Sequence, residues 1–165
     1  MGNDPPIVMF AVLPHLDWRL KDTANNILAT KEFVVNLVSE MTAEAMNVTC
    51  IDAPPGRNEL ELAHLETAPS IKIKPPRVNS SPVAFECCFR TSLSFGANQI
   101  IMVGEVLHAY VADQFILDAT RCVVDTPSLK LVGSMHGAKW YAKTSDLFGM
   151  ERPTWAEWLR QGKAS

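Results

Sequence analysis

The sequence predicts a mainly β fold with short helices, in which long antiparallel strands form a barrel. Residues 82–95 alternate between two sets of side chains with a period of two, which is typical of a strand. Residues 99–113 form a second long β-rich run, and Gly-Ala-Asn at 96–98 between the two is typical of a hairpin turn. Closing such strands into a barrel removes exposed strand edges, so a barrel is the expected architecture.

Two further strands flank a helix near the start of the chain. The continuous apolar run at 7–12 predicts a strand buried on both faces, and residues 32–38 predict the next strand. Between them, residues 21–31 have helical spacing, with Asp22 or Thr23 as the N-cap. The apolar face of this helix is formed by Ala24, Ile27 and Leu28.

The other elements follow from shorter patterns. Residues 39–49 predict a second short helix, and residues 59–66 predict one or two helical turns. The proline-interrupted stretch 71–82 predicts an extended edge strand, and residues 140–145 a further extended piece.

Two single residues in the sequence, a glycine and a proline, have a specific structural meaning. Gly104, in the middle of a long strand, predicts a bulge or the close approach of another backbone. Pro153 begins a C-terminal helix. The apolar face of that helix is formed by Trp155, Trp158 and Leu159.

Length and composition describe one globular domain over residues 1–165. Hydrophobic residues make up 47% of the chain and charged residues 20%, which is ordinary for a folded protein. The formal charge is −3 and the cations are scattered, so nucleic acid is not expected as a partner. No apolar run is long enough to span a bilayer, and the N-terminus lacks the layout of a signal peptide.

The cysteines argue for a cytoplasmic protein without a metal site. Cys50, Cys87, Cys88 and Cys122 include no Cys-x-x-Cys pair. We therefore interpret them as reduced thiols used for packing. A zinc site would require closely spaced ligand pairs, and no metal ligand set is predicted.

The Lys-Asp-Thr at 21–23 admits two interpretations. The ordinary one is a helix cap. The other is a phosphate site, because the first turn of a helix presents unpaired N–H groups and a partial positive charge. Lys21 would add a full charge, Thr23 a hydroxyl donor and Asn26 an amide, whereas Asp22 repels a phosphate unless its carboxylate turns back to the helix.

An ordered series of stretches adds a family resemblance. These are "PPIVMFAV", "KDTANNI", "EFVVNLV", "EAMNVT", "PPRVNSSPVAFEC", "VGEVLHAYV" and "MHGAKWYAKT". Together, from about residue 5 to residue 154, they resemble the flavin reductase-like, FMN-binding split-barrel family, in particular its flavoredoxin-like branch. The resemblance implies a split β-barrel and a homodimer with flavin near the subunit interface. It also implies FMN or FAD as cofactor and NAD(P)H as the reductant.

The resemblance also implies which residues hold the flavin. Lys21, Asp22 and Thr23 match the segment beside the flavin phosphate, with Asn26 in support. Around the ring it implies the backbone at the end of the first strand, one position in the second helix and two positions near the C-terminus. These are Ala11, Val12, Leu13, Asn47, His136 and Tyr141. His136 is equally consistent with a plain turn residue, and strand alternation allows only one of Trp140 and Tyr141 to contact flavin.

Two features depart from the family. Ser134 stands where an arginine usually precedes Met-His-Gly. Members also carry about 30 or more residues before the stretch matched by "PPIVMF", whereas only "MGND" precedes it here. The expected barrel therefore lacks the family's N-terminal strand pair, and a dimer partner is expected to cover some of the exposed edges.

Three functions are compatible with these observations. The first is an NAD(P)H-dependent flavin oxidoreductase, in which the flavin accepts hydride and no protein side chain is predicted to be catalytic. The second is a flavin-binding electron carrier, because no Gly-x-Gly-x-x-Gly loop separately requires a nicotinamide cofactor. The third is a flavin-free dimeric interaction module.

Overall fold

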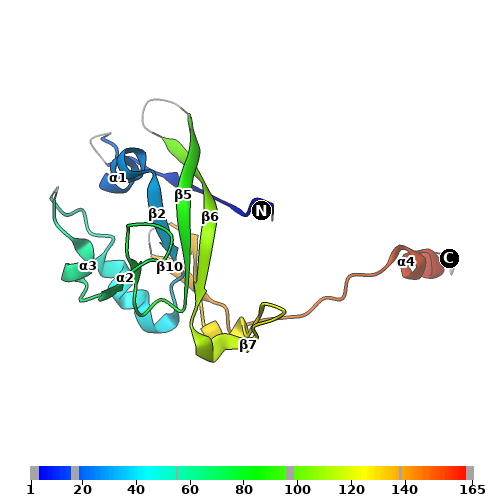
Figure 1. Cartoon of the computed structure of the whole chain (residues 1–165). Coiled ribbons are helices and arrows are strands. Elements are labelled where there is room, and N and C mark those ends of the chain that lie inside the picture. Colours follow the sequence, from blue (N-terminus) through cyan, green and yellow to red (C-terminus); the bar gives the residue numbers. More distant parts are fainter. Residues whose placement is uncertain (1–3, 16–18, 55, 96–98, 138, 163–165) are drawn as a thin grey trace.

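An open antiparallel sheet organises the molecule (Figure 1). The computed structural model describes residues 4–15, 19–54, 56–95, 99–137 and 139–162. The main sheet has the strand order β1-β6-β5-β2. Its strands are β1 (Ile7–Val12), β2 (Glu32–Asn36), β5 (Val83–Ser94) and β6 (Ile100–Val111). The mainly β prediction with short helices is confirmed, whereas the predicted turn at 96–98 lies outside the described residues.

Three small hairpins and several helices surround the main sheet. The hairpins pair β3 (Thr67–Ala68) with β4 (Arg77–Val78), β7 (Ile116–Asp118) with β8 (Val123–Val124), and β9 (Val132–His136) with β10 (Trp140–Lys143). The α-helices are α1 (Asp22–Thr30), α2 (Ala43–Val48), α3 (Glu59–Leu62) and α4 (Trp155–Gly162). Short 3-10 helices occupy Glu40–Thr42, Asp113–Phe115 and Pro127–Leu129.

Strand β1 is not buried on both faces as expected. Only Val12 is buried, and the Met9 side chain is 65% exposed. Val8, Phe10 and Val12 face the core, whereas Met9 and Ala11 lie on the opposite, exposed face of the sheet. Strand β1 is also an edge strand, because it pairs only with β6. Among the described residues β2 is the other edge, and an apolar cavity of about 790 Å³ lies between the two edge strands beside α1.

The core lies between α1 and the inner face of the main sheet. Its buried residues are Val12, Ala24, Ile27, Phe33, Cys87, Ile100 and Met102. Half-buried Leu28 packs against this cluster, so the predicted apolar face of the helix is confirmed. Burial of this face stabilises α1 more than its own helix propensity does.

Gly104 lies at a strand irregularity, as expected, but the group that approaches it most closely is a side chain and not another backbone. A Cβ at this position would lie 2.7 Å from Cε1 of Phe33 and closer still to the end of that ring. The register between β5 and β6 also shifts between Phe89 and Thr91, beside the partner of Gly104. The absence of a side chain at Gly104 therefore leaves room for the Phe33 ring against the sheet.

The stretch 71–82, expected as an extended edge strand, pairs only through β4. The backbone N–H groups of Ile71 and Lys72 donate instead to the carboxylate of buried Glu86, at 2.9 and 2.6 Å. A side chain therefore takes the place of a neighbouring strand for this stretch.

The helix predicted at 39–49 is divided into a 3-10 turn and α2. Ser39 is the N-cap of the 3-10 turn, where Ser39 N–H donates to Thr42 Oγ1 at 3.1 Å and the two hydroxyls lie 3.3 Å apart. The change of helix type after Thr42 was not predicted from the sequence.

The four cysteines are free thiols, and their exposure predicts a selective reaction. Burial, together with Cys88 and Glu86 nearby, raises the pKa of the Cys87 thiol to about 12. Since the thiolate is the reactive form, we expect iodoacetamide at pH 8 to modify exposed Cys50 and Cys122 but to spare Cys87 until the chain is unfolded in urea. Peptide mass mapping measures this, and equal rates at Cys50 and Cys87 in the native protein would contradict the burial.

Candidate functional site

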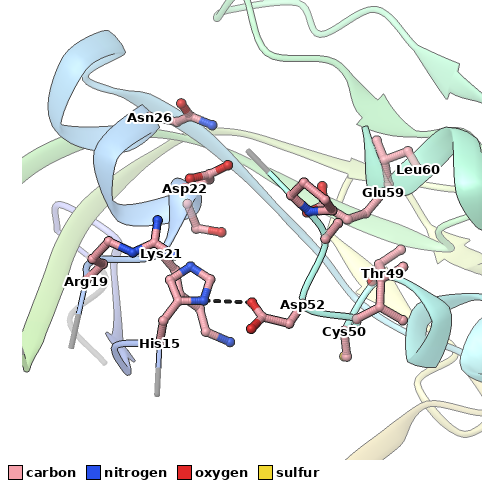
Figure 2. Close-up of a pocket in the computed structure, with 14 residues that line it drawn as sticks. His15, Arg19, Lys21, Asp22, Asn26, Thr49, Cys50, Asp52, Glu59 and Leu60 are labelled. Atoms are coloured by element: carbon pink, nitrogen blue, oxygen red, sulfur yellow. Dashed lines mark ion pairs between the residues drawn. The ribbon is translucent and has the colours of Figure 1, made fainter. Parts of the chain in front are cut away.

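A cavity of about 580 Å³ lies at the start of α1. Its walls come from the segment after β1, the first turn of α1, the segment after α2 and the start of α3 (Figure 2). The lining residues are His15, Arg19, Lys21, Asp22, Thr23, Asn26, Thr49, Cys50, Ile51, Asp52, Ala53, Pro54, Glu59 and Leu60. The cavity thus joins two parts of the chain that lie far apart in the sequence.

The N-terminus of α1 corrects the predicted cap. The N-cap is Lys21, with extended backbone at φ −65° and ψ 153°, and no side chain caps the helix within the described residues. A lysine side chain has no acceptor atom, and Asp22 and Thr23 already lie inside the first turn. Ala24 N–H and Asn25 N–H donate to the carbonyl of Lys21, at 2.9 and 3.2 Å. The N–H groups of Asp22 and Thr23 have no acceptor among the described residues.

Acidic and basic side chains are unevenly distributed around the cavity. Figure 2 shows Arg19 and Lys21 on the side of α1, together with Asp22 and the imidazole of His15, and Asp52 and Glu59 on the opposite wall. His15 Nδ1 lies 2.7 Å from Asp52 Oδ1, and this contact connects the two sides. A ligand with an anionic end would therefore be favoured near α1 and disfavoured at the opposite wall.

The residues predicted to bind the flavin phosphate lie together in the structure. Lys21, Asp22, Thr23 and Asn26 all line the cavity and are all exposed to it or to solvent. Sequence reasoning missed the opposite wall, because the contact between His15 and Asp52 depends on tertiary folding and has no local signal.

The residues predicted to surround the ring are dispersed. Asn47 and Tyr141 line a second cavity of about 520 Å³ between α2 and the β9–β10 hairpin. His136 stacks on Trp140, with ring centroids 5.9 Å apart. At the end of β1, Val12 is buried in the core whereas Ala11 and Leu13 are exposed, and none of these three lines either cavity.

The described part of the chain meets the requirements neither for a metal site of three or more protein ligands nor for a membrane-spanning helix. Within it, no group of three or more His, Cys, Asp or Glu side chains could hold a metal ion. No described helix combines the length and apolar character required to cross a bilayer.

The fold and this cavity define a mainly β protein in which the N-terminus of α1, without a side-chain cap among the described residues, lies beside an open sheet. The chain belongs to the flavin reductase-like domain family, which matches residues 1–124. An uncharacterised protein of Deinococcus radiodurans is 39% identical over 164 residues, covering 99% of this chain and 72% of that protein. The family predicted from the sequence is confirmed.

Solved structures support the same assignment. A 2-nitrobenzoate 2-nitroreductase of Pseudomonas fluorescens is 31% identical with a TM-score of 0.83, covering 94% of this chain and 73% of that one. A split-barrel protein of Shewanella frigidimarina has a TM-score of 0.78 at 19% identity, covering 93% and 74% of the two chains. The predicted split-barrel fold class is therefore confirmed.

Proposed function

We propose that this protein binds FMN and acts as an NAD(P)H-dependent flavin oxidoreductase. The observation that supports it best is the uncapped N-terminus of α1 at the wall of a cavity, with Lys21, Thr23 and Asn26 around it. Membership of the flavin reductase-like family supports a flavin-related oxidoreductase, and FAD is the alternative cofactor.

The residues present fit the phosphate end of a flavin. Two first-turn N–H groups lack an acceptor among the described residues, and a phosphate would supply one to each. Lys21 would contribute a charge-assisted hydrogen bond and Thr23 a hydroxyl donor. Asp22 makes no capping hydrogen bond to the first turn within the described part of the chain, so its carboxylate repels a phosphate there, and Lys21 and the helix N–H groups oppose that repulsion.

The edge position of β1 supports placing the ring along Ala11, Val12 and Leu13. Because β1 pairs only with β6, alternate backbone N–H groups on its other side are available to a ligand within the described fold. When bound, flavin supplies the hydride chemistry. N–H donors directed at its polar edge would favour the reduced, more negatively charged form. Asn47, His136 and Tyr141 remain predicted ring contacts.

We further propose a cytoplasmic homodimer that acts on small molecules. All four cysteines are free, as expected in a reducing compartment. The net charge of −3 gives no electrostatic basis for nucleic acid as a partner.

Flavin titration tests the cofactor and the phosphate site together. We expect the purified protein to bind FMN at micromolar concentration, with a perturbed flavin spectrum and a raised melting temperature. Riboflavin, which lacks the phosphate, should bind much more weakly. Absence of FMN binding would refute the site and favour the flavin-free interaction module, and equal affinity for both flavins would refute the phosphate assignment.

Nicotinamide oxidation separates the reductase from the electron carrier. We expect oxidation of NADH or NADPH when free FMN is supplied, monitored by nicotinamide absorbance. Nitrobenzoates are further acceptors to test, because the Pseudomonas protein that is 31% identical is a 2-nitrobenzoate 2-nitroreductase. FMN binding without oxidation of either nicotinamide would favour the electron carrier instead.

A further inference from the structure

The C-terminal arm, defined as residues 145–162, extends away from the rest of the molecule (Figure 1). Every arm side chain described, from 145 to 160, is exposed, and the hydrogen bonds the structure gives them stay inside the arm. Its exposed apolar residues are Leu147, Phe148, Met150, Trp155, Trp158 and Leu159. Such a concentration of apolar side chains in solvent indicates a surface that binds something.

The helix at the end of the arm is specified by its own sequence. Thr154 and Glu157 form a reciprocal cap, with Thr154 N–H and hydroxyl each 2.7 Å from Glu157 Oε2 and Glu157 N–H 3.3 Å from Thr154 Oγ1. Trp155 and Trp158 stack with ring centroids 5.1 Å apart. A helix as short as α4 is marginal in water without tertiary packing, so this cap and stack prepare a surface that requires a partner.

We propose that the C-terminal arm packs on a second copy of this chain, so that two copies exchange arms in the homodimer. The arm starts from a fixed point, because Thr144 N–H and hydroxyl both donate to the Leu131 carbonyl at 3.0 Å. From there to Trp155 an extended chain spans roughly 35 Å, about the diameter of a small domain. That reach carries α4 past its own sheet and onto a neighbour.

The outer face of the main sheet offers the receiving surface. Met9 pairs in register with Val103, and Ile101 pairs with Leu93, on the face opposite the core. Met9 and Leu93 are among the exposed large hydrophobic residues, whereas Ile101 and Val103 are half-buried. Each copy of the chain offers both an arm and an apolar receiving face. With two-fold symmetry, two copies use both of their surfaces on each other, so assembly stops at the dimer.

Charge and area favour a second copy over other occupants. The charged side chains of the described arm are Asp146, Glu151, Arg152, Glu157 and Arg160, which sum to −1, so an anionic membrane does not attract the arm. Burying Phe148, Trp155 and Trp158 at roughly 150–250 Å² each removes about 900–1,500 Å² from two arms. With the receiving faces included, this reaches the size of a stable interface.

Association measurements on arm variants test the proposal. Sedimentation velocity over a dilution series should show a dimer for the full chain. The variant Trp155→Ala/Trp158→Ala should raise the dimer dissociation constant about a hundredfold or more, because both rings are aromatic anchors. Met9→Glu should weaken the dimer similarly from the receiving side. Leu117→Ala, at an exposed apolar residue outside both surfaces, is the matched control and should leave the constant unchanged.

Each other outcome overturns the proposal. An unchanged dissociation constant in the double variant would show that the dimer forms without the arm, whereas FMN binding by that variant would leave the proposed function intact. A monomeric full chain would show that the arm packs elsewhere. A full chain that stays monomeric but sediments with phosphatidylserine vesicles would assign the arm to membrane surfaces. Circular dichroism of each variant confirms that the sheet remains folded.

Discussion

Replacing Glu86 by alanine is expected to lower the free energy of unfolding by about 2–4 kcal/mol. The Glu86 side chain is 1% exposed, and its two carboxylate oxygens accept hydrogen bonds from Ile71 N–H and Lys72 N–H. Truncation leaves both part-buried backbone donors without their carboxylate acceptor, and each such loss costs about 1–3 kcal/mol. Urea unfolding followed by circular dichroism measures the change.

Two further variants show whether the hydrogen bonds are responsible. Glu86→Gln should lie between wild type and alanine, because its amide oxygen can accept one bond while its NH₂ group faces the other donor. Glu44→Ala, at an exposed glutamate of α2, should change the free energy by no more than about 0.5 kcal/mol. A Glu86→Ala protein as stable as wild type would show that the stretch after Ser70 is held by other contacts.

The long strands were predictable because their signals are local. Alternation over 82–95 and the β-rich run over 99–113 correspond to β5 and β6, and Gly104 lies where the ladder shifts and a ring approaches. Alternation alone could not show that Glu86 is buried. Its carboxylate accepts hydrogen bonds from an irregular segment distant in the sequence, and local alternation carries no signal for that contact.

In the candidate site, too, the residues that are close in sequence were predictable and those that meet only through folding were not. Lys21, Thr23 and Asn26 lie within about one turn of a single helix, so forming the helix brings them together and sequence reasoning could find them. The opposite wall, including Asp52, comes from a segment that follows α2 and reaches His15 only in the folded chain. The position of the cap also depended on where the helix begins, which is the least certain feature of a helical pattern.

Removing the Lys21 ammonium is expected to raise the dissociation constant for FMN about 10- to 100-fold. Lys21→Ala keeps an N-cap without a side-chain acceptor, so the helix should begin at the same residue. What is lost is one charge-assisted hydrogen bond to the phosphate, which contributes about 1.5–3 kcal/mol when made. Fluorescence titration of FMN measures the change, and its dependence on salt should weaken because one cation is gone.

The comparison with riboflavin locates the effect at the phosphate. If Lys21 contacts only that group, the weak affinity for riboflavin should be the same in Lys21→Ala and wild type. Lys74→Ala removes an exposed lysine outside the cavity lining and serves as the matched control, with FMN affinity within about twofold of wild type. A parallel loss for both flavins would place Lys21 at the ring or in the fold. No loss for either would mean that an anion bound at α1 is held by backbone N–H groups alone, since those donors remain in the variant.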